Sequence, residues 1–217
     1  MDADFWLQRW QNKQTGFHQL EVNPRLETFW PQLQLQAGDQ VFVPLCGKSL
    51  DMLWLREHYD VLGVELSPLA VESFFTDNDL EPEHNRQGEF SVCRAERLTL
   101  LCGDFFDLRP GQLAHVRAVY DRASLIALPT AIRPRFVAHL TSLLPPGTPL
   151  LLITLDYDQA QMDGPPFSVS GAEVRALFES HWSIQRLHAH DILAGEPRFR
   201  ERGLSSLSEK VYLLRKQ

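Results

Sequence analysis

Short runs of consecutive apolar residues alternate with segments of helical period along most of the chain. Strands that are apolar on both faces are typical of a parallel sheet covered by helices on both sides. The runs predict five strands, at residues 39–44, 61–66, 98–101, 118–120 and 150–155. The helical period predicts helices at residues 49–58, 132–144 and 171–181, and one that begins after Ser67. Because crossover connections are right-handed, we expect a doubly wound α/β fold.

The two ends of the chain depart from this pattern. Residues 1–37 are rich in tryptophan, glutamine and polar groups, so we expect a helical or irregular N-terminal segment. Two further strands are expected at 183–187 and 210–214 with no obvious helix between them, which favours an antiparallel edge. No repeat or linker interrupts the sequence. We therefore predict a single domain over residues 1–217, with its core in 38–217.

Composition limits the classes of protein to consider. The 217 residues are 44% hydrophobic and 23% charged, as in a globular chain that needs no disulfide or metal to fold. The net charge of -7 disfavours a nucleic-acid partner, because phosphate binding needs a basic field. No apolar run approaches the ~20 residues of a membrane span, and the start does not resemble a signal peptide. We expect a cytoplasmic protein with no membrane or metal partner, whose cysteines Cys46, Cys93 and Cys102 are reduced.

Candidate chemistry is expected beyond the carboxyl ends of the strands, where ligands bind in open α/β sheets. The residues that follow the predicted strands are 44–49, Glu65, 103–104, 121–122 and 156–158. The spacing from the first of these loops to Glu65 resembles a nucleotide-binding layout. In that layout an acid about 20 residues after the loop accepts hydrogen bonds from the ribose hydroxyls.

The loop at 44–49 contains one glycine, Gly47, and not the three of a dinucleotide-binding motif. A pyrophosphate needs close approach by several backbone N–H groups, so this loop weighs against NAD and FAD. It does not weigh against S-adenosylmethionine, which has an adenosine but no phosphate. Gly47-Lys48-Ser49 also resembles the end of a P-loop, but Phe42 occupies the position of the upstream glycine and excludes that interpretation.

Each candidate also has a purely structural interpretation. Gly47 can be an ordinary turn glycine, Glu65 a helix cap or a solvated acid, and Asp104 a loop residue. Trp6 and Trp10 share one face of a helix, which is more often a core face. The functional alternative is a lid whose indole rings face a sulfonium or an aromatic substrate. Three candidate sites placed together at strand ends favour ligand binding more than any one of them does.

A series of short motifs runs in order along nearly the whole chain. They are WLQRW at 6–10, TGFH at 15–18, VPLCGK at 43–48, GVELS at 63–67, FDL at 106–108, YDR at 120–122, GPPF at 164–167 and EKVYLL at 209–214. Together they resemble the thiopurine S-methyltransferase family, whose first loop has this single-glycine form. There are three departures from the family pattern, at Ala123, at Asp104 and in residues 56–60, which look one residue short. None touches the expected chemistry, but Asp104 makes the expected adenine contact more like that of other methyltransferases.

The resemblance implies a class I methyltransferase fold, a Rossmann-like domain with a helical lid at 1–37. Its sheet would have seven mostly parallel strands, with an antiparallel last strand. The donor would be S-adenosylmethionine, and the acceptor the sulfur of an aromatic or heterocyclic thiol such as a thiopurine. The short form looks like the bacterial branch, for which the resemblance also suggests methylation of selenium or tellurium oxyanions. A monomer is the expected state.

The motifs also assign residues to a site. The resemblance places at the cofactor Trp6, Trp10, Leu45, Glu65, Asp104, Phe105 and Arg122. Among these, Asp104 and Phe105 would flank the adenine. Arg122 and Arg198 would lie near the substrate as the catalytic residues.

A methyl group on a sulfonium is already activated, so the protein mainly has to align the acceptor and exclude water. Heterocyclic thiols are at least partly ionised near neutral pH, so no strong base is required, and an arginine nearby favours the anion. Asp121 and Arg122 can instead form a local ion pair, and Cys46 is interpreted as a packing residue. A non-catalytic nucleotide-binding module and an NAD-dependent reductase remain as alternatives. Neither explains the tryptophan pair, the one-glycine loop and the PLCGK motif together.

Overall fold

The computed structural model describes residues 3–15 and 18–217, so Gly16 and Phe17 of the TGFH motif lie outside the described residues. The chain divides into two compact units, Met1–Val119 and Tyr120–Gln217, here called the N-terminal and the C-terminal unit. The single domain expected over the whole chain stays a prediction.

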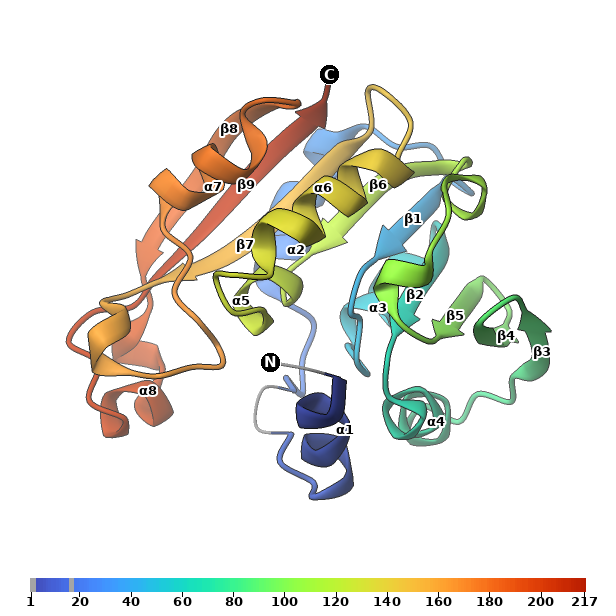
Figure 1. Ribbon diagram of the computed structural model, residues 1–217, viewed down its shortest axis with the longest axis horizontal. Coiled ribbons are helices and arrows are strands. Elements are labelled where there is room, and N and C mark those ends of the chain that lie inside the picture. The colour runs from blue at the N-terminus through green and yellow to red at the C-terminus, as the bar shows by residue number, and fades with distance from the viewer. Residues whose placement is uncertain (1–2, 16–17) are drawn as a thin grey trace. The chain divides into compact units, whose positions relative to one another are not determined.

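The N-terminal unit is built on a mixed sheet (Figure 1). Its parallel strands lie in the order β5, β2, β1, β6. Their bounds are β1 (Gln40–Val43), β2 (Asp60–Glu65), β5 (Leu98–Cys102) and β6 (Val116–Asp121). Consecutive residues such as Val41, Phe42 and Val43 are all buried, which explains the continuous apolar runs in the sequence. The predicted parallel core is confirmed for these strands.

An antiparallel hairpin of β3 (Glu83–Gln87) and β4 (Phe90–Ala95) extends this sheet beside β5. The described residues therefore contain nine strands rather than the expected seven. The sequence does not predict the hairpin because every residue of β3 is exposed and polar or charged. Such an edge strand carries no apolar period, and its pairing with β4 holds it in place.

The helices of the N-terminal unit are α1 (Ala3–Gln11), α2 (Pro24–Phe29), α3 (Asp51–Arg56) and α4 (Pro68–Asp77), with 3-10 turns η1 (Trp30–Leu33), η2 (Phe105–Asp107) and η3 (Pro110–Gln112). As predicted, α4 begins after Ser67, whose side chain accepts the Ala70 N–H at 3.3 Å. Its buried face includes Val71 and Phe74. Leu69 is 43% exposed, because it lies two residues before Val71 and so points away from that face.

The C-terminal unit contains α5 (Ser124–Ala127), α6 (Arg133–Leu143), β7 (Pro149–Asp156), η4 (Gln159–Gln161), α7 (Gly171–Phe178), β8 (Trp182–Asp191), η5 (Leu193–Gly195), α8 (Pro197–Glu201) and β9 (Ser208–Lys216). The last strand, β9, lies between β7 and β8 and is antiparallel to both, so the predicted antiparallel last strand is confirmed. The sequence did not predict η5 and α8, which are too short to show a helical period.

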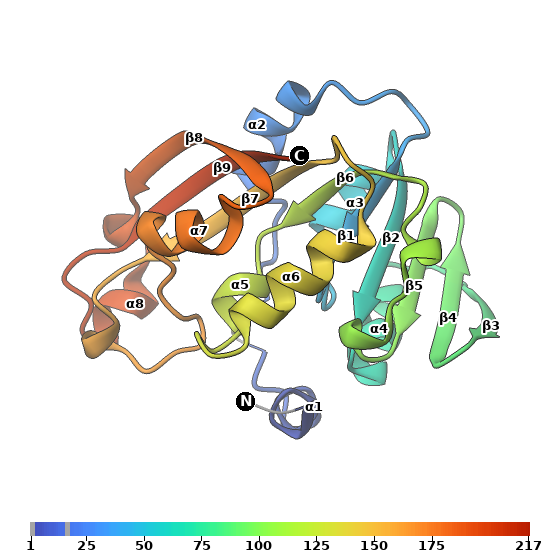
Figure 2. The same cartoon turned by 45° about the horizontal axis from the view of Figure 1, so that its top comes forward.

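Helices α6 and α7 lie on the same face of β7, β9 and β8 (Figure 2). The Trp182 indole N–H donates to the Thr141 hydroxyl at 2.9 Å and so joins the start of β8 to α6. Within the ranges 3–15 and 18–217, no helix is long and apolar enough to cross a membrane.

Candidate cofactor-binding site

The loop after β1 contains two residues with left-handed backbone. Leu45 has φ 46° and Gly47 has φ 53°. Glycine adopts this region freely, but leucine does not, so Leu45 stores backbone strain. The Cys46 N–H donates to the Val64 carbonyl at 3.0 Å and fastens the loop to β2. A strained residue at the end of a central strand indicates a functional site.

Glu65 ends β2 and is buried, with 7% of its surface exposed. Its Oε2 accepts the Gly47 N–H at 2.9 Å, and its Oε1 accepts the Ser67 N–H at 2.8 Å. The carboxylate therefore joins the first loop to the start of α4. Burial raises the pKa of Glu65, and the N–H donors of Ser67 and Gly47 oppose that rise. Each carboxylate oxygen has a second lone pair, so Glu65 can also accept the hydroxyl groups of a ligand.

Trp10 of α1 lies against Gly47. A Cβ atom placed on Gly47 would be 3.4 Å from Trp10 Cζ2, and Trp10 is 8% exposed. Trp6 is only half-buried, and its ring meets the Phe5 ring edge-on with 5.4 Å between centroids. The two tryptophans therefore differ, because Trp10 packs on the first loop whereas Trp6 keeps part of its surface exposed.

The end of β5 lies beside the end of β2, because the two strands pair in parallel. The Gly103 N–H donates to the Glu65 carbonyl at 2.9 Å. A Cβ atom on Gly103 would come within 2.7 Å of Phe90 Cδ1, so a larger residue would have to displace that ring. The first loop, Glu65 and Gly103 thus meet at one edge of the sheet, where α/β proteins bind ligands.

Asp104 and Phe105 both have local roles. Asp104 is exposed, and its Oδ1 accepts the Phe106 N–H at 2.9 Å, which caps η2. The Phe105 ring is buried and meets the Phe106 ring edge-on at 5.4 Å. Asp104 thus lies in the loop between β5 and η2, and the contacts of Asp104 and Phe105 with an adenine stay predictions.

The cysteines of the chain are free thiols. A Cβ atom on Gly63 would lie 2.8 Å from Cys46 Sγ, so Cys46 fills the space that this glycine leaves. Burial and the nearby Glu65 carboxylate raise the pKa of Cys46, and the same causes raise the pKa of Cys102 to about 11. A neutral thiol is a poor nucleophile, which supports packing as the role of Cys46. In the part of the chain that the structure describes, no group of three His, Cys, Asp or Glu residues could hold a metal ion.

Lys48, the last residue of the VPLCGK motif, has a structural partner that the sequence does not reveal. Its Nζ forms an ion pair with Asp77 Oδ2 at 2.8 Å. Asp77 is the last residue of α4, whereas Ser67, bound by Glu65, precedes the first. The last residue of α4 is therefore bound to the first loop through Lys48. The start of α4 is bound to the Glu65 carboxylate, which also binds Gly47 of the same loop.

In the C-terminal unit, Asp121 ends β6 and Arg122 follows it. Asp121 is 1% exposed, and its Oδ1 accepts the Ser124 N–H at 2.9 Å. Burial raises the pKa of Asp121 to about 6, against the lowering effect of its hydrogen bonds to Ser124 and neighbouring N–H groups. The carboxylate of Asp121 thus fixes the start of α5, and the Arg122 side chain is half-buried.

Arg198 belongs to α8 and is exposed. Its Nε lies 3.3 Å from Glu196 Oε2, and its guanidinium carbon lies 4.8 Å from the centre of the Phe199 ring. Phe199 is buried in a small apolar cluster with Tyr157 and Leu207. The burial of Phe199 in this cluster therefore helps to fix the place of Arg198 in α8.

The predicted cofactor residues other than Arg122 belong to the N-terminal unit, namely Trp6, Trp10, Leu45, Glu65, Asp104 and Phe105. Within this unit Gly47 contacts both Glu65 and Trp10. Arg122 and Arg198 belong to the C-terminal unit. The roles of all these residues toward a ligand stay predictions.

Sequence reasoning misses one buried charge of the C-terminal unit, Arg133. This residue has no exposed surface, and its Nη1 pairs with Glu173 Oε1 at 2.7 Å. An arginine at the start of a helix is typical of a solvated position, and its partner lies 40 residues further on. The one feature of the sequence that points to this part of the chain is the GPPF motif at 164–167, which ends directly before Ser168, whose carbonyl Arg133 binds.

Solved structures of S-adenosylmethionine-dependent methyltransferases share this fold. One from Anabaena variabilis gives a TM-score of 0.66 at 14% identity, covering 99% of this chain and 95% of that chain. The 1,6-didemethyltoxoflavin-N1-methyltransferase of Burkholderia thailandensis, solved with 1,6-didemethyltoxoflavin and S-adenosylhomocysteine, gives 0.65 at 13% identity, covering 99% and 87%. The chain thus has the α/β fold of this class, with a mixed sheet.

Sequence comparison narrows the class to one family. The family described as Thiopurine S-methyltransferase (TPMT) matches residues 1–217. A thiopurine S-methyltransferase of Nitrosospira multiformis is 54% identical over 215 residues, which are 99% of this chain and 98% of that protein. One of Xanthomonas campestris pv. campestris is 52% identical over 217 residues and all of both chains. The chain belongs to the thiopurine S-methyltransferase family, which confirms the resemblance.

Proposed function

We propose that the chain is an enzyme that transfers the methyl group of S-adenosylmethionine to the sulfur of aromatic or heterocyclic thiols, thiopurines included. The observation that carries this proposal is the family match over residues 1–217. Relatives named thiopurine S-methyltransferase, 54% and 52% identical over essentially the whole chain, support it. The fold shared with a methyltransferase solved with S-adenosylhomocysteine supports the donor.

The N-terminal unit fits this donor better than it fits a dinucleotide. The loop at 44–49 has one glycine and a strained Leu45, not the series of N–H groups that a pyrophosphate requires. Glu65 is fixed by two backbone donors and retains lone pairs for ribose hydroxyls. We propose that Glu65 binds the ribose hydroxyls of the donor and that Leu45 contacts the donor next to the ribose. Asp104 and Phe105 would flank its adenine.

Bound S-adenosylmethionine would supply a methyl group on a positively charged sulfonium, which needs no further activation. The residues of the chain then have to bind this donor, orient the acceptor sulfur and exclude water. The buried carboxylate of Glu65 and the turn at Leu45 provide a fixed frame, so little rearrangement accompanies binding. Cys46, buried and neutral, takes no part as a nucleophile.

We assign Arg122 and Arg198 to the acceptor, and Arg122 also to the cofactor. A guanidinium beside an acidic thiol favours the thiolate, which is the nucleophilic form. The thiol proton can leave to solvent before the transfer, so the mechanism needs no general base. Asp121 supports Arg122 by fixing the start of α5, the helix that begins two residues after this arginine.

We further propose that residues 1–37 act as a lid that keeps water from the donor. Trp10 supports this role, because it lies against Gly47 of the first loop. Trp6, one helical turn away and half-buried, has surface left for a ligand.

A monomeric cytoplasmic enzyme with a small-molecule acceptor is the form we propose. Free cysteines are typical of a reducing compartment, and the net charge of -7 disfavours nucleic acid. Size-exclusion chromatography with light scattering should give the mass of one chain. A stable dimer would contradict the monomer.

Calorimetric titration with S-adenosylmethionine and with NAD separates the proposed function from its rivals. We expect the former to bind and the latter not to bind, whereas binding of NAD alone would indicate a reductase. Methyl transfer is then measured on aryl thiols, thiopurines and selenite, the last to test the activity on oxyanions. A protein that binds S-adenosylmethionine and methylates none of them would be a binding module.

A further inference from the structure

Arg133, the first residue of α6, is a charged side chain with no exposed surface. The proposed mechanism does not use it. A buried guanidinium is costly unless hydrogen bonds and an opposite charge compensate for its lost hydration. The partners of Arg133 therefore identify the segments that it holds.

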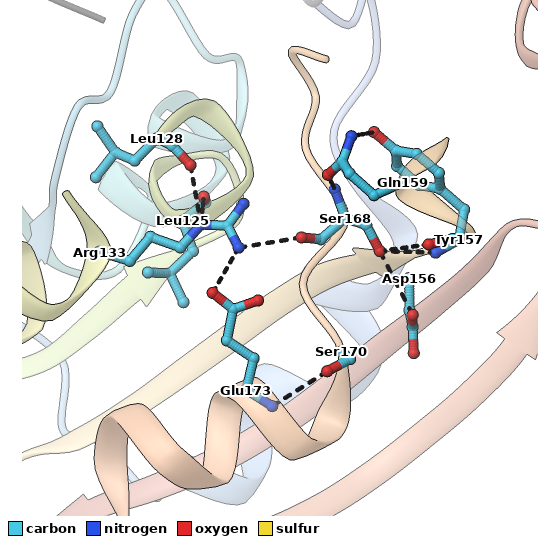
Figure 3. A network of polar contacts seen from close by, with 9 residues as sticks. All are labelled: Leu125, Leu128, Arg133, Asp156, Tyr157, Gln159, Ser168, Ser170 and Glu173. Carbon is cyan, nitrogen blue, oxygen red and sulfur yellow. Dashed lines mark hydrogen bonds and ion pairs between the residues drawn. The ribbon is translucent and has the colours of Figure 1, made fainter. Parts of the chain in front are cut away.

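Arg133 joins two segments that are distant in the sequence (Figure 3). Its Nε donates to the Leu125 carbonyl at 3.1 Å and to the Leu128 carbonyl at 2.9 Å. Its Nη1 donates to the Ser168 carbonyl at 3.0 Å and pairs with Glu173 Oε1 at 2.7 Å. The first two carbonyls belong to α5 and its C-cap residue, Leu128, and the Leu125 carbonyl also accepts the Leu128 N–H at 3.2 Å. The other two acceptors lie before α7 and in its first turn.

The first segment adjoins a residue that we assign to the proposed reaction, and the second adjoins one of the motifs that the chain shares with its family. Helix α5 begins two residues after Arg122, which we assign to the acceptor. The GPPF motif at 164–167 ends directly before Ser168. A direct contact supports the bridge made by Arg133, since the Phe167 N–H donates to the Ile126 carbonyl at 2.6 Å.

The loop around the GPPF motif is also fixed from its other side. The Ser168 N–H donates to Gln159 Oε1 at 2.9 Å. The Ser168 hydroxyl donates to the Tyr157 carbonyl at 2.7 Å and accepts the Tyr157 N–H at 3.0 Å. The Tyr157 hydroxyl donates in turn to the Pro166 carbonyl. Every polar group of Ser168 thus has a partner, and residues 166–168 have little freedom to move.

We propose that Arg133 is a positioning residue for the acceptor, which holds the Arg122 segment and the GPPF loop in one arrangement. This inference rests on the proposed thiol methyltransferase function. A planar guanidinium can donate along two edges at once, which a point-like ammonium cannot do. Arg133 acts through the placement of other groups, and displacement of a reacting group by about 1 Å can cost on the order of a hundredfold in rate.

Arg133→Lys tests the proposal, because lysine keeps the charge beside Glu173 but cannot reach both segments together. We expect kcat/KM for a thiopurine to fall at least about tenfold, while the affinity for S-adenosylmethionine stays within about twofold. The acid limb of the pH–rate profile should move to higher pH, because a displaced Arg122 stabilises the thiolate less.

Leu140→Ala is the matched control, because Leu140 is a buried residue of the same helix outside this network. It should lower Tm and leave the pH profile and kcat/KM at the wild-type values. Arg133→Lys kinetics that match the wild type or Leu140→Ala would overturn the proposal.

Ser168→Ala is the second variant, because it removes one hydroxyl and leaves no buried charge unpaired. Amide hydrogen exchange of residues 164–170 should accelerate in Ser168→Ala and in Arg133→Lys, measured without any ligand. If Arg133→Lys does not fold, the kinetics and exchange of Ser168→Ala decide, and wild-type values in both would overturn the proposal. A wild-type protein that methylates no thiol would refute the proposed function instead, and the exchange rates would still report whether Arg133 holds the loop.

Discussion

The end of β2 and the short helix α8 hold their predicted site residues in different ways. Glu65 is buried, and two backbone N–H groups fix its carboxylate. Arg198 is exposed, and its ion pair at 3.3 Å joins it to Glu196, two residues away. The position of Glu65 is set before a ligand binds, whereas the exposed Arg198 side chain would lose conformational freedom on binding the proposed acceptor. Substitutions at strand ends should therefore change the free energy of unfolding and the affinity for the donor. Substitutions in α8 should change only the reaction of the acceptor.

Glu65→Ala should have the largest effect. The affinity for S-adenosylmethionine should fall at least tenfold, because a hydrogen bond to a charged group contributes about 1.5–3 kcal/mol. The free energy of unfolding should fall by about 1–3 kcal/mol, since the buried N–H groups of Gly47 and Ser67 lose their acceptor. Titration and urea unfolding measure the two quantities, and Glu65→Gln, which keeps one acceptor oxygen, should lie between. An unchanged affinity in Glu65→Ala would remove Glu65 from the site.

Asp121 provides a pH test at the end of β6. Burial raises its pKa from 3.8 to about 6. Between these values the folded protein keeps a proton that the unfolded chain loses, so this group lowers stability as pH rises through the window. Asp121→Asn removes that dependence. On lowering the pH from about 7 to about 4, the wild type should gain on the order of 2 kcal/mol relative to the variant, by urea unfolding. A difference that does not change with pH would show that Asp121 is ionised without penalty.

Gly47 and Gly88 form a matched pair with nearly equal φ angles, 53° and 57°. Replacement of either by alanine should lower the free energy of unfolding by about 1 kcal/mol, because alanine disfavours this region. Gly47→Ala should in addition weaken the binding of S-adenosylmethionine, since a shift of the backbone at this position would move the N–H that binds Glu65. If titration gave the same affinity for S-adenosylmethionine in the two variants, the first loop would not be part of the donor site.

Arg198→Met should have the smallest effect on the protein itself. An exposed ion pair contributes little, so the free energy of unfolding should change by less than about 0.5 kcal/mol. The donor affinity should stay near wild type. The apparent pKa of the acceptor in the profile of kcat/KM should rise, because the thiolate loses a cationic neighbour, and Arg198→Lys should restore part of the effect. A profile identical to that of the wild type would leave Arg198 as a solvated surface residue.

The sequence predicts the parallel strands and the place of Glu65 at the end of one of them, because the patterns that mark these features are local. Continuous apolar runs mark the parallel strands, and the distance from Gly47 to Glu65 is fixed by one strand–helix–strand unit. Ser67 and Pro68 mark the start of α4 in the same way. In each case the deciding residues are close together in the sequence.

Other features depend on contacts that no local pattern encodes. The strand β3 is polar throughout and exists because it pairs with β4. The burial of Arg133 depends on Ser168 and Glu173, which lie 35 and 40 residues further along the chain. The Lys48–Asp77 ion pair likewise spans 29 residues. Such pairings become visible only when the chain is folded.

The central claim is that the methyl group is transferred to sulfur, and the product identifies its destination. The wild-type protein is incubated with a thiopurine and S-adenosylmethionine that carries a labelled methyl group, and the product is analysed by mass spectrometry and NMR. The account predicts a labelled S-methyl thioether, formed in equal amount with S-adenosylhomocysteine. A label on a ring nitrogen, or bound S-adenosylmethionine with no labelled product, would contradict it.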